Sequence, residues 1–146
     1  MKKLLFIGLL LGLTTLSYGQ EIKVITVIES IVPGGIGRSR IIEKQENTDF
    51  NSFTTTRTDG KKSKQGDVDR KDLKIENFDE TKLLNFYSMA GINFQNIASN
   101  DAVISSKLTQ MVQDGWKLVF VTSGTESNAG KDDKTGIFIT RFIFQR

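Results

Sequence analysis

The clearest hydrophobic pattern lies in the last third of the chain. Four residues recur at i, i+4, i+7 and i+11, which places them on one stripe of a helix: Ile104, Leu108, Met111 and Gly115. We expect this helix to begin at Ser99 or Asn100, either of which can cap it. We expect it to stop at Gly115, because glycine enters a left-handed turn without steric cost.

Two strands are predicted after this helix. Over residues 116–121 the side chains alternate, so that Trp116, Leu118 and Phe120 share one face of a strand. Residues 137–144 are apolar except for Thr140 and Arg141 and should pair beside it. On this last strand three phenylalanines share one face and three isoleucines share the other: Phe138, Phe142 and Phe144 against Ile137, Ile139 and Ile143. If the helix covers one face only, the other needs cover from the middle of the chain or from a partner subunit.

A further strand opens the fold at residues 21–32. Both of its faces are apolar, which is typical of an interior strand. One face carries Ile22, Val24, Thr26 and Ile28, and the other carries Ile25, Val27 and Ile31. Residues 33–37, Pro-Gly-Gly-Ile-Gly, must end it, and residues 38–43 should return as the second arm of a hairpin.

The middle of the chain is more polar. Residues 44–72 form a polar, loop-rich insert, in which residues 50–56 are compatible with a strand and residues 58–72 with a long mobile loop. In residues 73–98, Asp79 is typical of a helix start and Gly91 of its stop, which favours a short helix followed by an extended segment. Alternation around Phe86 and Phe94 leaves strands open as the alternative.

Together these elements predict one α+β domain over residues 20–146, an antiparallel sheet packed by one or two helices. Residues 1–19 have the features of a signal peptide, namely a basic start, a short apolar run and a Ser17-Tyr18-Gly19 cleavage site. We therefore expect export, with cleavage near Gly19 and Gln20, to the periplasm or the exterior. No later apolar run has membrane-spanning length, so no transmembrane segment is expected in the mature chain.

Composition narrows the chemistry. Two of the 20 Lys and Arg residues leave with the signal peptide, so 18 basic and 17 acidic residues remain. The mature domain is therefore nearly neutral and lacks the excess positive charge that favours binding to nucleic acid. The chain has no Cys and no His, which excludes disulfides, thiolate nucleophiles and Cys-ligated zinc and removes the commonest general base. No catalytic residue, metal or cofactor is predicted.

The candidate ligand site is the glycine hairpin. Backbone N–H groups of Gly34, Gly35 and Gly37 could form an anion nest, to which Arg38 and Arg40 would add charge. A dinucleotide fingerprint fails, because Arg40 stands where its third glycine belongs. The competing interpretation is a hairpin loop with solvated arginines.

Other polar groups give weaker signals. Two acidic clusters could supply oxygens to calcium, but interleaved Lys and Arg favour solvated loops. These clusters are Asp67, Asp69 and Asp72, and Glu126, Asp132 and Asp133. Gly130-Lys131 lacks the spacing of a phosphate-binding loop. Trp116 is more typical of a core residue than of a platform for a ligand. Tyr87 and Ser88 have no neighbouring base that would activate either of them as a nucleophile.

The C-terminal pattern resembles a small bacterial family of unknown function, which is marked by a helix, a Gly-Trp-Glu-Leu-Val strand and a last strand ending Phe-Lys-Arg. Here the matching residues are Gly-Trp-Lys-Leu-Val at 115–119 and Ile-Phe-Gln-Arg at 143–146, so that Lys117 and Gln145 depart from the family. The opening strand, Ile-Lys-Val-Ile at 22–25, is also similar. The sequence Glu-Ser-Ile-Val-Pro-Gly-Gly before Gly37 resembles exported bacterial proteins of unknown function. The resemblance implies an antiparallel sheet with a helix across one face and implies no reaction.

These observations favour an exported, non-catalytic binding or envelope-associated interaction protein, with a protein or envelope partner or a homo-oligomer. A binder of small ligands or anions through the glycine hairpin, residues 33–40, is the alternative. An enzyme that works without His or Cys comes third.

Overall fold

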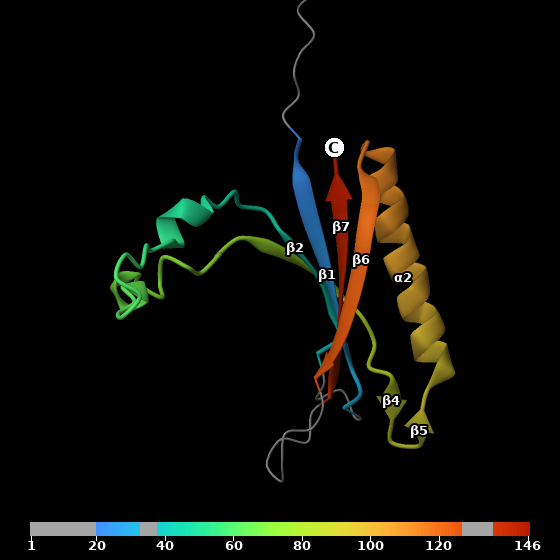
Figure 1. Ribbon diagram of the computed structural model, residues 1–146. Helices are drawn as coiled ribbons and strands as arrows, with labels where there is room; N and C mark the ends of the chain where they lie inside the picture. Colours follow the sequence, from blue (N-terminus) through green and yellow to red (C-terminus); the bar gives the residue numbers. More distant parts are fainter. Residues whose placement is uncertain (1–19, 33–37, 127–135) are drawn as a thin grey trace, which may run out of the picture.

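The structure is a computed structural model that describes residues 20–32, 38–126 and 136–146. Its main strands are β1 (Ile22–Ser30), β2 (Arg40–Lys44), β3 (Phe78–Lys82), β6 (Lys117–Glu126) and β7 (Ile137–Gln145), and its helix is α2 (Phe94–Gln113). The strands form one antiparallel sheet of five in the order β3-β2-β1-β7-β6, and α2 lies across one face (Figure 1). The predicted α+β class is confirmed. The predicted signal peptide, residues 1–19, lies outside the described residues.

The central strand is β1, as its two apolar faces predicted. It pairs with β2 on one side and with β7 on the other, and Ile25 lies opposite both Glu43 and Phe142. The predicted return arm of the hairpin is therefore β2. The glycines that join the two arms lie outside the described residues.

Helix α2 begins earlier than the apolar stripe indicated. Its cap is Asn93, whose side chain accepts a hydrogen bond from the backbone N–H of Asn96 at 3.2 Å, so the predicted start at Ser99 or Asn100 is wrong. The stripe continues backward through Asn100, which is buried inside the fold. The predicted stop is confirmed, because Gly115 has φ +87° in the left-handed region.

Residues 73–98 correct a second prediction. No helix forms between Asp79 and Gly91; these residues contain β3, which pairs with β2, and a small hairpin of β4 (Tyr87–Ser88) and β5 (Gly91–Ile92). Gly91 has φ +113° and occupies the turn of that hairpin, so it does not stop a helix. Strand pairing between β2 and β3 therefore outweighs the local preference of Asp79 for the start of a helix.

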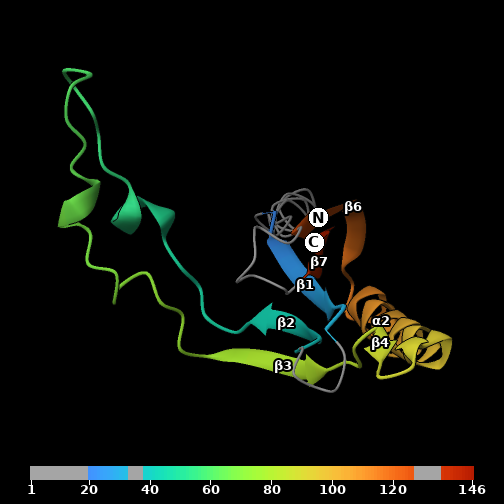
Figure 2. The same cartoon turned by 90° about the horizontal axis from the view of Figure 1, so that it is seen from below.

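Beyond Lys44, which ends β2, the polar insert contains no strand. The compatible strand at residues 50–56 is instead a 3₁₀ helix, η1 (Phe50–Phe53), capped by the Asp49 side chain, and a second one, η2 (Gln65–Asp67), follows. We call residues 45–77 the extension; a backbone hydrogen bond from Gln45 N to Asn77 O closes its base. Figures 1 and 2 show the extension reaching out on the side of the sheet opposite to α2.

The core lies between α2 and the sheet. Its buried apolar members are Ile25, Val27, Ile41, Leu83, Met111, Trp116 and Phe144. Phe144 is completely buried and Trp116 is 5% exposed, which confirms Trp116 as a core residue. The phenylalanine face of β7 is thus the face toward α2. The isoleucine face points to the opposite side, which we call the open face.

Strand β6 departs from simple alternation. Leu118 pairs with Phe144 and Phe120 with Ile143, so Val119 is an extra residue in a β-bulge. The bulge moves Phe120 to the open face, where its side chain is 59% exposed. The prediction that Trp116, Leu118 and Phe120 share one face is therefore wrong for Phe120.

The buried tryptophan gives a first prediction. Trp116→Ala should lower the free energy of unfolding by about 3–5 kcal/mol, since it empties a large space in the only helix–sheet core of the described chain. Phe50→Ala is the control, because Phe50 is 71% exposed and its loss should cost about 0.5 kcal/mol or less. Thermal or denaturant unfolding measures both, and equal stabilities would contradict the assignment of Trp116 to the core.

The mobility of the extension stays a prediction. Its residues 58–72 contribute no buried side chain, so little energy opposes local opening there. Limited proteolysis should cut first within this stretch. First cuts within residues 118–121 would contradict it.

Candidate functional site

The glycine hairpin is only partly within the described residues. Gly34, Gly35 and Gly37 lie outside them, and Arg38 is exposed. Arg40 Nη1 forms an ion pair with Glu80 Oε1 across β2 and β3, and Arg40 Nε donates to the Arg38 carbonyl at 3.3 Å. The structure thus brings Arg40 to a carboxylate, which neutralises the charge that an anion nest would use.

The other candidates are dispersed. Asp67, Asp69 and Asp72 are exposed, and within the described ranges no three His, Cys, Asp or Glu side chains are placed to hold a metal ion. Glu126 ends β6, whereas Asp132 and Asp133 lie outside the described residues. In the β4–β5 hairpin, the Ser88 hydroxyl donates to the Gly91 carbonyl at 3.3 Å.

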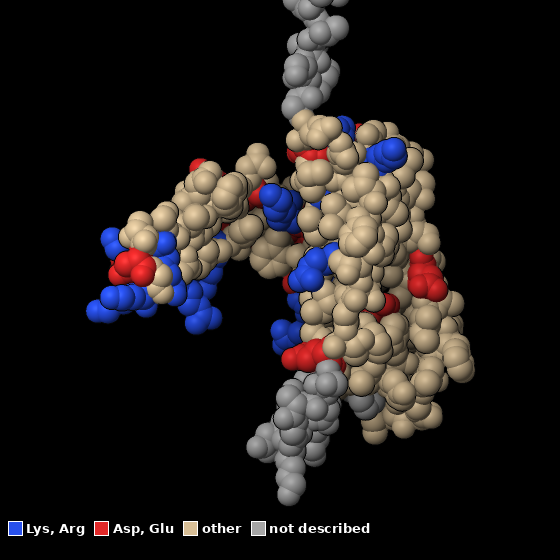
Figure 3. All heavy atoms as spheres, in the orientation of Figure 1, with Lys and Arg blue, Asp and Glu red and all other residues tan. Residues whose placement is uncertain are grey.

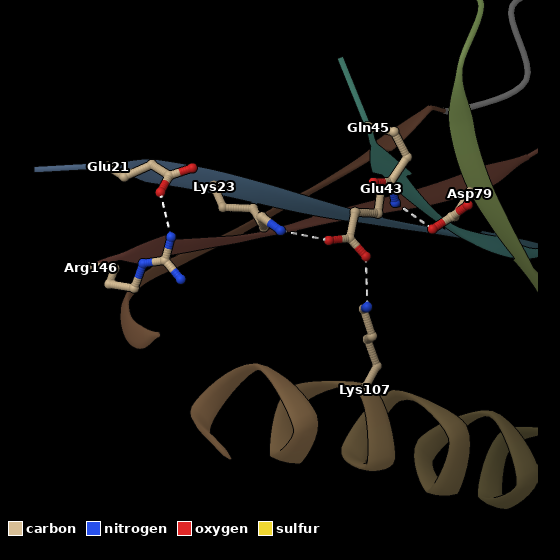
Figure 4. A network of polar contacts seen from close by, with 7 residues as sticks. All are labelled: Glu21, Lys23, Glu43, Gln45, Asp79, Lys107 and Arg146. Carbon is tan, nitrogen blue, oxygen red and sulfur yellow. Dashed lines mark hydrogen bonds and ion pairs between the residues drawn. The ribbon is translucent and has the colours of Figure 1, made fainter. Parts of the chain in front are cut away.

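A charged cluster joins the helix to the sheet (Figure 4). The Glu43 carboxylate projects from β2 toward α2, where Oε2 lies 2.6 Å from Lys107 Nζ. Its Oε1 lies 2.9 Å from Lys23 Nζ on the neighbouring strand β1. The Glu43 side chain is 8% exposed, and both of its oxygens are bonded to cations.

This cluster sets the ionisation of Glu43. Burial alone would raise the pKa of Glu43, but the hydrogen bonds and charges of Lys107 and Lys23 outweigh burial, and the pKa lies below its ordinary value. Lys23 Nζ also lies 5.0 Å from the centre of the Trp116 ring, and the Arg146 guanidinium lies 4.6 Å from it. Arg146 is in turn paired with Glu21. These contacts favour a structural role, in which Glu43 fastens α2 and two strands together.

A shallow groove runs beside this cluster, between β3 and α2. One pocket of about 270 Å³ is lined by Ile41, Glu43, Asp79, Glu80, Thr81 and Lys107. A second, of about 390 Å³, shares Thr81 and Lys107 and is otherwise lined by α2 residues. The most buried charged groups that line the groove, Glu43 and Lys107, already form an ion pair with each other.

A second buried network holds the beginning of α2. Asn100 is 1% exposed; its side chain accepts from Leu84 N and donates to Leu84 O, each at 2.8 Å. Its Nδ2 also donates to Glu29 Oε1 at 3.0 Å. Desolvation raises the pKa of Glu29, the Asn100 hydrogen bond opposes this, and the charge of Asp101 adds to the rise. Nearby, Asn85 Oδ1 accepts from the Ser39 hydroxyl at 2.9 Å.

Strand β6 presents a long exposed surface. It is the last strand of the sheet, no described strand pairs with its outer edge, and all ten of its residues are exposed. Four consecutive exposed residues are apolar: Leu118, Val119, Phe120 and Val121. In Figure 3 the surface over β6 is mostly uncharged, whereas Lys and Arg crowd the extension. An exposed, long apolar edge is a surface that natural proteins normally protect.

Sequence reasoning missed the Glu43 cluster and the Asn100 network. One signal was available for Glu43, because it follows Ile41 by two residues and therefore shares the inward face of β2. No local signal marks Asn100 or Lys107, because an amide or an ammonium on a helix stripe is ordinarily solvated.

Comparisons with known proteins add no relative. Neither models of protein families, nor curated proteins, nor solved structures give a match to this chain. The resemblance drawn from the C-terminal motif stays a prediction. Among the described residues, no helix has both the length and the apolar character to cross a membrane.

The charged cluster predicts a pH effect. The pKa of Glu43 is lower in the folded chain than its ordinary value of 4.5. This group therefore stabilises the fold above pH 4.5, and the stabilisation disappears as the pH falls through the folded pKa. Glu43→Gln should cost about 1–3 kcal/mol at neutral pH, less than a fully buried pair, because both lysines keep contact with water. The variant should also lose stability less steeply than the parent when acidified below pH 4.5.

Glu29→Gln is the matched control. The pKa of Glu29 is raised, so its ionisation costs stability above pH 4.5 and the substitution should remove that cost. Urea unfolding from pH 3 to 7 measures the free energy of unfolding of the parent and of both variants. Parallel profiles for the parent and Glu43→Gln would contradict the role given to the lysine pairs.

Proposed function

We propose that this chain is an exported, non-catalytic interaction protein that binds a partner chain through β6. The observation that carries the proposal is the exposure of the whole of β6 at the margin of the sheet. Unpaired backbone N–H and C=O groups on such an edge can add a strand from a partner, while the side chains supply specificity.

The open face extends this surface. Phe120 projects on the same side of the sheet as its cross-strand partner Ile143, and Val24 of β1 lies opposite Ile143 in turn. Val24 and Ile143 are half-buried, and Phe120 is exposed. An apolar row therefore runs from the edge inward, which gives a partner both an edge and an adjoining face to contact.

The polar clusters support a structural role over a catalytic one. Glu43 is held by two lysines, Arg40 by Glu80, and Asn100 by backbone groups of Leu84. Each of these charged or polar groups has its partner within the fold, which suits a role in stability. Export rests on the signal-peptide pattern of residues 1–19.

Site-specific photo-cross-linking tests the proposed function. A photoreactive phenylalanine analogue at position 120 should give one defined adduct in cells that produce the chain, because a bound partner lies within reach of this side chain. The same analogue at position 94 is the control, since Phe94 is 77% exposed but lies at the start of α2. Absence of any adduct at position 120, or the same adducts at both positions, would contradict binding through β6.

A further inference from the structure

The two edges of the sheet differ in how they are protected. Edge strand β3 has five residues, and three of them are charged: Asp79, Glu80 and Lys82. Strand β6 is twice as long and carries charges only at its ends, Lys117 and Glu126. Short charged edges resist pairing with other chains, whereas a long apolar edge invites it.

Resting on the proposed function, we propose that the partner of β6 is a second copy of this chain. The two β6 strands pair antiparallel about a two-fold axis that passes between the two copies of Thr122. The two five-stranded sheets then form one continuous sheet, and each copy presents the same strand to the other.

The register follows from the pairing of β6 with β7. Thr122 lies opposite Arg141, Lys117 opposite Gln145 and Glu126 opposite Ile137. Along β7, Gln145 and Ile137 are each four residues from Arg141. Because the bulge absorbs one residue, Lys117 and Glu126 are thus equally far from Thr122. A two-fold axis at Thr122 therefore places Lys117 of each copy opposite Glu126 of the other.

The charges also lie on the correct face. Lys117 and Glu126 share the open face, because their partners Gln145 and Ile137 both project there. Residues directly opposite in an antiparallel pair share a face, so the two oppositely charged side chains meet. This pairing occurs twice in a symmetric dimer, once at each end.

The same register matches the interior of the strand. Phe120 and Gly124 lie at equal distances from Thr122, since Ile143 and Ile139 are each two residues from Arg141. Each Phe120 ring thus meets Gly124 of the other copy. No heavy atom lies within 4 Å of the position that a side chain would occupy at Gly124, which leaves room for the ring. An aromatic side chain across from a strand glycine stabilises the pair. At the axis, Thr122 meets Thr122, a favourable cross-strand combination.

A second copy fits better than a different protein because β6 is complementary to itself. Opposite charges, a ring against a glycine, and a threonine pair all arise from one register of one strand. A different partner would require a separate strand with the mirrored pattern.

Charge reversal tests this register. Analytical ultracentrifugation of the purified protein should show a reversible monomer–dimer equilibrium. Lys117→Glu and Glu126→Lys, each at an exposed position, should each weaken dimerisation about tenfold or more, because like charges then face each other at both ends. The variant with both substitutions should have the same dimer dissociation constant as the parent. A protein that stays monomeric at its highest soluble concentration would overturn the proposal. So would a dimer whose dissociation constant is unchanged by either charge reversal.

Disulfide trapping locates the axis. The chain has no cysteine, so a single introduced one reports on one position. Two Thr122→Cys residues would lie directly opposite, with Cα atoms about 4.5–5.5 Å apart, which suits a disulfide. Ser123→Cys is the matched control, because its two copies would be diagonal and about 7–8 Å apart. Mild oxidation should therefore yield covalent dimer for Thr122→Cys only, and equal yields would overturn the register.

The two proposals fail separately. An adduct at position 120 that contains another protein, together with a monomeric purified chain, would uphold binding through β6 and overturn self-pairing. An adduct of two copies of this chain supports both. A dimer that forms without any adduct at position 120 would place the interface elsewhere and overturn both.

Discussion

The constraint on which this fold depends is that one helix must cover a sheet of five strands. A helix with its side chains is about 10–12 Å wide, whereas five strands spaced about 4.8 Å apart span about 19 Å between the outer two. Helix α2 is bonded to two inner strands, since Asn100 donates to Glu29 on β1 and Lys107 pairs with Glu43 on β2. Within the described ranges, β6 at one margin is exposed over its whole length, and the open face carries the exposed residues Ile22 and Arg141. The surface proposed for binding is thus a geometrical consequence of the packing.

The position of α2 is set by polar as well as apolar contacts. Asn100 and Lys107 are one heptad apart on the stripe that faces the sheet, and each is bonded to a specific partner there. Apolar contacts alone would tolerate sliding of the helix along the sheet, because they are not directional. A displaced helix would take Lys107 away from Glu43 and Asn100 away from the Leu84 backbone, at a cost in free energy. The two polar contacts therefore fix where the helix lies, and Met111 and Trp116 close its far end.

The sequence predicted the parts of the fold that local patterns determine. Periodicity identified β1, β6 and β7, and glycine signals identified the return strand β2 and the end of α2 at Gly115, because each is marked within a few residues. It was wrong about β3, whose strand exists only through pairing with β2, and about the start of α2, where Asn93 caps one of several possible turns. The Glu43 cluster joins residues from two strands and a helix, so no local pattern could assemble it. The sequence did not identify β6 as a candidate binding surface. It indicated only that the second face of the last strand needs cover from another segment or a partner.

The bulge at Val119 links the fold to the proposed interface. In a regular strand Lys117 and Glu126, nine positions apart, would project to opposite faces. The extra residue brings both to the open face and moves Phe120 there as well. Without the bulge, Trp116 could still enter the core, but Phe120 would share its face and β6 would no longer be symmetric about Thr122. One inserted residue thus leaves Trp116 in the core and creates the self-complementary pattern along the rest of the strand.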